Sequence, residues 1–135
     1  MSEIRLPHIN KVLLTGYLTR DPELRHTKND IAVCNFRLAI SRKYKGPNNE
    51  WKENVCYVNV VAWKRLAELC VQHLHKSSAV FIEGELQNYV IELDHRTLVE
   101  IRAFRIQFLD KNRHFPIELV DDSEDVNYGD QDNEE

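Results

Sequence analysis

Aromatic and cationic side chains interleave between residues 37 and 69, where two strand-like runs flank a polar turn and lead into a helix-like run. The rings are Tyr44, Tyr57 and Trp63, and the cations around the turn are Arg42, Lys43, Lys45 and Lys52. Flat rings stack on bases and cations neutralise phosphates, which is how unpaired nucleic acid is bound. A sheet covered by protein on both faces would explain the same residues, so this pattern alone leaves both interpretations open.

Alternation divides the side chains of residues 54–63 between two faces, because a strand sends successive side chains to opposite sides. One face carries Val55, Tyr57, Asn59, Val61 and Trp63. The other carries Cys56, Val58, Val60 and Ala62, and is apolar enough to face a core. The same alternation in residues 33–41 leaves Arg37 on a side open to solvent or ligand. We therefore predict that Tyr57, Trp63 and Arg37 lie on accessible faces.

Catalytic and metal-binding chemistry find little support in the sequence. His73 and His75 are two residues apart on the expected helix, so they cannot bind one metal together as an i, i+4 pair would. Glu83 and Glu85 alternate with apolar residues, which a solvated strand edge explains better than an acid–base pair. The sequence contains neither a Gly-rich phosphate loop nor a nucleophile elbow. We expect no enzyme activity, no cofactor and no metal.

The net charge of −4 averages over two unlike segments. Residues 121–135 contain eight acidic residues and no Lys or Arg, for a charge of −8, which leaves residues 1–120 at +4. A segment this acidic and this poor in apolar residues cannot bury enough surface to offset the entropy lost on ordering. We expect a disordered acidic tail, for which solubility is the simplest role.

A length of 135 residues suits one domain with short appendages. The N-terminus lacks the apolar stretch of a secretory signal, and the apolar runs are too short to span a membrane, so we expect a cytoplasmic protein. The cysteines Cys34, Cys56 and Cys70 are odd in number and show no CxxC spacing. We interpret all three as small buried hydrophobic residues.

Strand signals are dense and the helical signal is single. Strands are expected at 11–18, 33–41, 54–63 and 77–86, a loop at 46–49, a helix from Leu66 to Lys76, and a hairpin over 88–108 that turns near Asp94 and His95. Gly16 suggests a bulge or a sharp bend. Five strands with one helix between the third and fourth follow the order of the OB-fold, a five-stranded Greek-key barrel. We expect an N-terminal extension at 1–9, the barrel at 10–111 and the tail at 112–135.

Several segments in order, NKVLLTGYLTRDPELRHT, AVCNFRLAISRKYK, WKENVCYVNVVAWKRLAELC, VFIEGEL and RIQFLDK, resemble the bacterial single-stranded DNA-binding proteins. The resemblance runs from residue 10 to residue 111. It implies an OB-fold, coating of single-stranded DNA during replication, repair and recombination, a nucleoid association in the cytoplasm and a homotetramer. At matching positions, Tyr44, Tyr57 and Trp63 fall where the family places base-stacking aromatics, and a basic loop follows Tyr44.

The chain departs from the family pattern in three places. After IEGEL the family usually has a basic stretch with another stacking aromatic, whereas this chain has no Lys or Arg until Arg96 and offers Tyr89 as a substitute. The hairpin that follows is short. The terminus DQDNEE lacks the Pro and Phe by which family tails dock replication and repair enzymes. These departures keep an alternative open: an OB-fold adaptor of a replication or restart complex that binds DNA weakly.

Overall fold

Backbone pairing closes five strands into a barrel. The computed structural model describes residues 3–91, 93, 95–109 and, for the backbone alone, 117–120. The elements are β1 (Val12–Leu18), β2 (Glu23–His26), β3 (Ala32–Lys45), β4 (Trp51–Trp63), α1 (Lys64–His73), β5 (Ala79–Ile91), β6 (Arg96–Leu109) and β7 (Ile117–Val120). The strand order β1-β5-β6-β4-β3 returns to β1 through a β1–β3 pairing. Together with one helix between β4 and β5, this confirms the expected OB-fold.

Alternate residues of the barrel strands fill its interior. Leu38, Val60, Ile82 and Ile106 are fully buried, and each contributes about 1.5–3 kcal/mol relative to an exposed side chain. Gly16 lies where β1 approaches β3, and a Cβ there would collide with the carbonyl oxygen of Ala39. Of the bulge or bend suggested at Gly16, the bulge is not found, because β1 pairs with β5 without a shift. A register shift that was not predicted lies between Glu83 and Gly84, in the pairing of β5 with β6.

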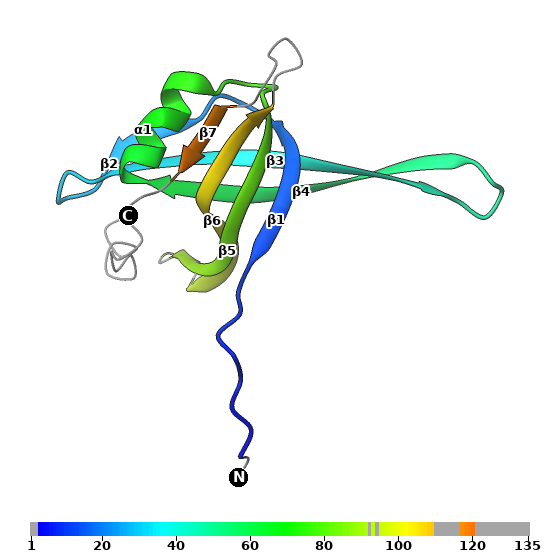
Figure 1. The fold of residues 1–135 in the computed structure, drawn as a ribbon, viewed down its shortest axis with the longest axis horizontal. Coiled ribbons are helices and arrows are strands. Elements are labelled where there is room, and N and C mark those ends of the chain that lie inside the picture. The colour runs from blue at the N-terminus through cyan, green and yellow to red at the C-terminus, as the bar shows by residue number, and fades with distance from the viewer. Residues whose placement is uncertain (1–2, 92, 94, 110–116, 121–135) are drawn as a thin grey trace.

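A long hairpin, formed by β3 and β4, projects from the barrel (Figure 1). Pairing runs from Val33 opposite Trp63 to Lys45 opposite Trp51, beyond the strand ends expected from the sequence. The expected loop at 46–49 is confirmed, and the Gly46 N–H donates to the Glu50 carbonyl at 2.8 Å. We call residues 41–55 the arm. All residues in its two strands are exposed, so no apolar core formed by the described residues supports it.

Two strands of the structure were not predicted. The four residues of β2 are all exposed, while their backbone pairs with β3. Strand β7 pairs with β6 and lies inside the segment 112–135 that we assigned to the tail. The rest of that segment is outside the described residues. The β5–β6 hairpin turns between Ile91 and Arg96, as expected, and α1 ends at His73, before the expected Lys76.

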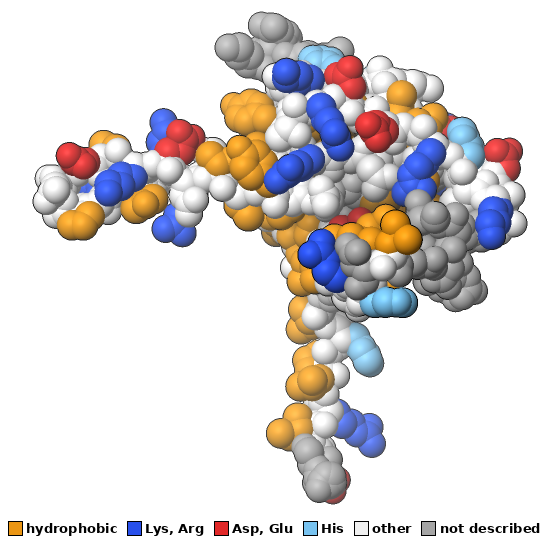
Figure 2. All heavy atoms as spheres, turned by 180° about the vertical axis from the view of Figure 1, so that it is seen from behind, with side chains coloured by type: hydrophobic (Ala, Val, Ile, Leu, Met, Phe, Trp, Pro, Cys, Tyr) orange, Lys and Arg blue, Asp and Glu red, His pale blue; other side chains and the backbone are white. Residues whose placement is uncertain are grey.

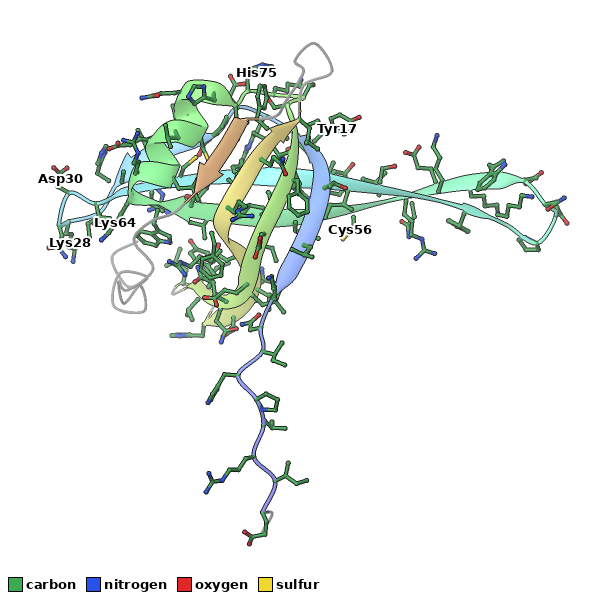
Figure 3. All side chains as sticks on the ribbon, in the orientation of Figure 1. Tyr17, Lys28, Asp30, Cys56, Lys64 and His75 are labelled. Carbon is green, nitrogen blue, oxygen red and sulfur yellow. The ribbon has the colours of Figure 1, made fainter. Side chains whose placement is uncertain are left out.

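The cysteines divide into a buried pair and an exposed one. Cys34 and Cys70 are buried, as expected, and a hydrogen bond between the thiols together with burial raises the pKa of Cys70 well above its ordinary value. The prediction that Cys56 is buried is wrong. It lies where β4 leaves the barrel, on the face that is core further along the strand, and its side chain is exposed there (Figure 3). Among the described residues, no helix has the length and apolar character needed to cross a membrane.

Candidate nucleic-acid interface

The β3–β4 ladder determines which side chains share a face, because directly paired residues project to the same side of a sheet. Arg37 lies opposite Asn59, and Ala39 lies opposite Tyr57. The intervening side chain of Leu38 points into the core. Arg37, Tyr57 and Asn59 therefore lie together on the outer face of the barrel, as alternation predicted.

Tyr57 combines a stacking surface with a neighbouring cation. Its side chain is 53% exposed, and the Arg37 guanidinium lies over the ring, 4.7 Å from the centroid. A cation held at this distance is attracted by the ring face and is also close enough to meet the phosphate of a stacked nucleotide. This pair satisfies both requirements of single-strand binding within one small area.

An open groove of about 290 Å³ extends this surface between β3 and the β5–β6 hairpin. Tyr89 lines it together with Arg37 and Asn59, so the structure brings this candidate to the predicted face. Two further cations, Arg20 and Arg25, also line the groove. They were missed because they lie before and on the unpredicted strand β2, where the run RDPELR is the only signal.

The groove also contains acidic groups. Glu23 and Glu100 line it, and the Gln87 side-chain amide donates to the Glu100 carboxylate at 2.9 Å. Further along β5 and β6, Glu83 accepts from the Lys11 ammonium at 2.9 Å, which lowers the pKa of Glu83, and Arg105 adds to the effect from 3.9 Å. The β5–β6 side of the interface is therefore less basic than the β2–β3 side.

Trp63 does not lie on an accessible face. Its side chain is 2% exposed and packs with Val33 and Val61, with the partly buried Ile31 against them. Alternation assigned Trp63 to the correct side of β4, but this end of the outer face is covered. The prediction that Trp63 offers an open ring is therefore wrong in this structure, and its burial indicates a packing role.

The arm distributes the remaining candidates over two faces. One, which we call the Tyr44 face, carries Arg42, Tyr44 and Lys52; the other, the Trp51 face, carries Lys43, Lys45 and Trp51. Tyr44 is 37% exposed, and the Arg42 guanidinium lies 5.5 Å from its ring centroid. Figure 2 shows Lys and Arg side chains of the arm beside apolar ones.

Trp51 was not among the sequence candidates. It is 69% exposed, and the Lys45 ammonium lies 5.5 Å from its ring centroid. The expected strand began at residue 54, so Trp51 fell between that strand and the loop expected at 46–49. Its position beside Lys52 in the run NEWKE, within the same basic segment as Tyr44, is the signal that could have identified it.

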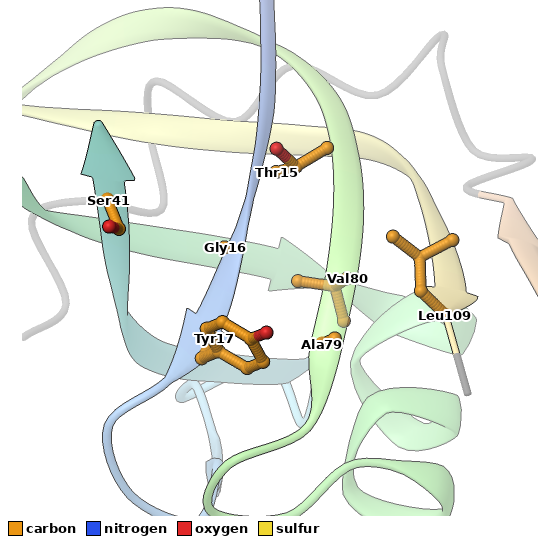
Figure 4. A pocket seen from close by; sticks show the side chains of 7 residues that line it. All are labelled: Thr15, Gly16, Tyr17, Ser41, Ala79, Val80 and Leu109. Atoms are coloured by element: carbon orange, nitrogen blue, oxygen red, sulfur yellow. The ribbon is translucent and has the colours of Figure 1, made fainter. Parts of the chain in front are cut away.

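A second exposed tyrosine continues the outer face onto β1. Tyr17 is 57% exposed and lies opposite Ala39, which in turn lies opposite Tyr57. Tyr17 and Tyr57 therefore lie on either side of Ala39, on strands whose backbones are about 10 Å apart. A shallow hollow of about 180 Å³ lies beside Tyr17, with Ser41 and Leu109 among its lining residues (Figure 4).

These features define an OB-fold protein with exposed rings and cations on one hairpin and in the adjoining groove. A profile of the Single-strand binding protein family matches residues 9–109. The chain belongs to this family.

Similar proteins agree with this assignment. The chain is 47% identical over 112 residues to "Single-stranded DNA-binding protein 2" of Chlorobaculum tepidum, covering 80% of this chain and 76% of that protein. It is 39% identical over 105 residues to "Single-stranded DNA-binding protein A" of Bacillus subtilis, covering 76% and 60% of the two chains.

Solved structures share the fold. The wild-type single-stranded DNA binding protein from Thermus aquaticus superposes with a TM-score of 0.67 at 28% identity, over 76% of this chain and 51% of that one. A Plasmodium falciparum SSB complex with ssDNA gives a TM-score of 0.67 at 21% identity, over 79% of this chain and all of that one. The chain thus spans less than two thirds of the Bacillus and Thermus proteins.

Proposed function

We propose that this protein binds and coats single-stranded DNA without sequence preference during replication, repair and recombination. The observation that carries the proposal is the repeated pairing of an exposed ring with a cation: Tyr57 with Arg37, Tyr44 with Arg42, and Trp51 with Lys45. Every base has a π-face, so stacking of this kind tolerates any sequence, while the cations neutralise the backbone.

The binding surface in this proposal comprises the groove and the arm. Its residues are Arg20, Arg25, Arg37, Tyr57 and Tyr89 around the groove, and Arg42, Lys43, Tyr44, Lys45, Trp51 and Lys52 on the arm. Family membership supports a homotetramer that works with the nucleoid in the cytoplasm and has no enzyme activity. Recruitment of replication and repair proteins would use the acidity of residues 121–135.

A salt titration with labelled oligo-dT and a duplex of equal length tests the function. Coating predicts tight binding to the single strand, a preference over the duplex, and a linear fall of the logarithm of affinity with the logarithm of salt concentration, because cations are released from the phosphates. Equal affinity for duplex and single strand would contradict the proposal.

The acids Glu23 and Glu100 in the groove, and the absence of Lys and Arg from residues 84–95, favour a second candidate. This is a protein-interaction adaptor of a replication or restart complex with weak DNA binding. It predicts little binding to oligo-dT even at low salt, so the same titration separates the two functions.

A further inference from the structure

We propose that both faces of the arm bind single-stranded DNA, so that one arm holds two segments of strand. The inference rests on the proposed function, whose binding surface includes Trp51, and adds that the Trp51 face and the Tyr44 face bind separate segments of the strand.

The ladder register places two ring–cation pairs next to each other on opposite sides of the arm. Tyr44 lies opposite Lys52, and the adjacent position pairs Lys45 with Trp51. Neighbouring positions of a strand project to opposite faces, so the two pairs cannot share one side. Because the pairs are adjacent, the twist of the hairpin cannot bring them onto the same side.

Each face has the chemistry needed to bind a nucleotide. On the Tyr44 face, Arg42 approaches the ring and Lys52 lies across from it; on the Trp51 face, Lys45 approaches the ring and Lys43 lies two residues away. Each face thus has one exposed ring and two cations. A hollow lined by Trp51, Lys43, Lys52 and Glu53 lies at this end of the arm.

Among the described residues, neither face of the arm is buried by packing against the rest of the protein. Along the barrel part of β3 and β4, one face is buried in the core, as Leu38 and Val60 show. In the arm, both strands are exposed on both sides. Of the two rings, Trp51 is the more exposed, at 69% against 37% for Tyr44. A ring left at 69% exposure beside a cation is poorly explained by folding and is well suited to stacking.

The two faces differ in charge. Glu53 lies opposite Lys43 on the Trp51 face and accepts a hydrogen bond from the Ser41 hydroxyl. Asn54 lies opposite Arg42 on the Tyr44 face. The Trp51 face therefore has one net positive charge and the Tyr44 face has two. We expect the Tyr44 face to contribute more to the salt dependence of binding.

Substitution of one ring at a time tests the inference in the full chain. Trp51→Ala and Tyr44→Ala should each weaken binding to a long oligo-dT by about 5- to 150-fold, the loss expected for one stacked base, and the two losses should multiply in the double variant. In the Tyr44→Ala variant, long oligo-dT should still quench the fluorescence of Trp51, because the opposite face continues to bind.

Val71→Ala, at an exposed position on α1 away from the arm, is the matched control and should bind like the wild type. Wild-type affinity in a folded Trp51→Ala variant, or the absence of Trp51 quenching in a wild-type complex, would overturn the inference and leave the proposed function intact. Failure of the wild type itself to bind oligo-dT would instead reject the proposed function.

Discussion

Replacing Tyr57 with alanine should weaken DNA binding while the protein stays folded. The lost stack should raise the Kd for oligo-dT by the equivalent of about 1–3 kcal/mol. The folded protein also loses the contact with Arg37, about 0.5–1 kcal/mol at an exposed site. Because the ring is 53% exposed, its burial contributes only about half of the 1.5–3 kcal/mol of a fully buried side chain. The free energy of unfolding should therefore fall by about 1.3–2.5 kcal/mol, which leaves the barrel folded.

Fluorescence anisotropy of a labelled oligo-dT measures the Kd, and urea unfolding measures the stability of the same preparation. Tyr57→Phe is the matched control, since it keeps the ring and should keep most of the affinity. If the Tyr57→Ala variant is folded and binds with wild-type affinity, Tyr57 does not stack on DNA and the assignment of the outer barrel face is refuted.

Other variants test separate parts of the structure. Trp63→Ala should lower the free energy of unfolding by about 3–5 kcal/mol in urea melts, whereas a stable variant with reduced DNA affinity would contradict its burial. Replacing Lys43 and Lys45 with Gln should flatten the log–log salt slope by about 0.7 per lost phosphate contact, and an unchanged slope would place the DNA elsewhere. A thiol reagent should modify Cys56 rapidly in the native protein, and Cys34 and Cys70 only on unfolding, because these two are buried. Mass spectrometry gives the number of modified thiols. Deleting residues 121–135 should tighten DNA binding most at low salt, because the tail competes with phosphate, and the gain should fade as screening shortens to roughly 8 Å at physiological ionic strength. Equal affinity with and without the tail across the titration would reject that competition.

Alternation of apolar residues predicted the barrel strands well where one face is buried. The inward side chains of Cys34, Phe36 and Leu38 mark β3, and the core confirms them. The arm was underestimated because backbone pairing, without a buried face, extends β3 and β4 past their apolar pattern. Strand β2 was not predicted for the same reason, because all of its side chains are exposed and it has no apolar pattern on a buried face.

The wrong predictions for Trp63 and Cys56 have one physical origin. Alternation tells which side of a strand a residue occupies, but not whether that side is covered at that point along the strand. Trp63 lies on the outer side, where other groups cover it, and Cys56 lies on the inner side, beyond the end of the core. Tyr89 lines the groove because the barrel closes. Closure pairs β4 with β6, which are distant in the sequence, and so brings the β5–β6 hairpin beside β4.

The lack of a core in the arm has a consequence for how the protein opens. Separating the two strands of the arm exposes almost no new apolar surface, so it does not require the barrel to unfold. Amide hydrogens of residues 42–45 and 51–54 should therefore exchange with deuterium by local fraying, while those of Leu38 and Val60 wait for global unfolding. Strand separation in the arm is thus an independent, low-energy event. A ligand bound to the arm should slow amide exchange in the arm, while the exchange rates of the barrel stay unchanged.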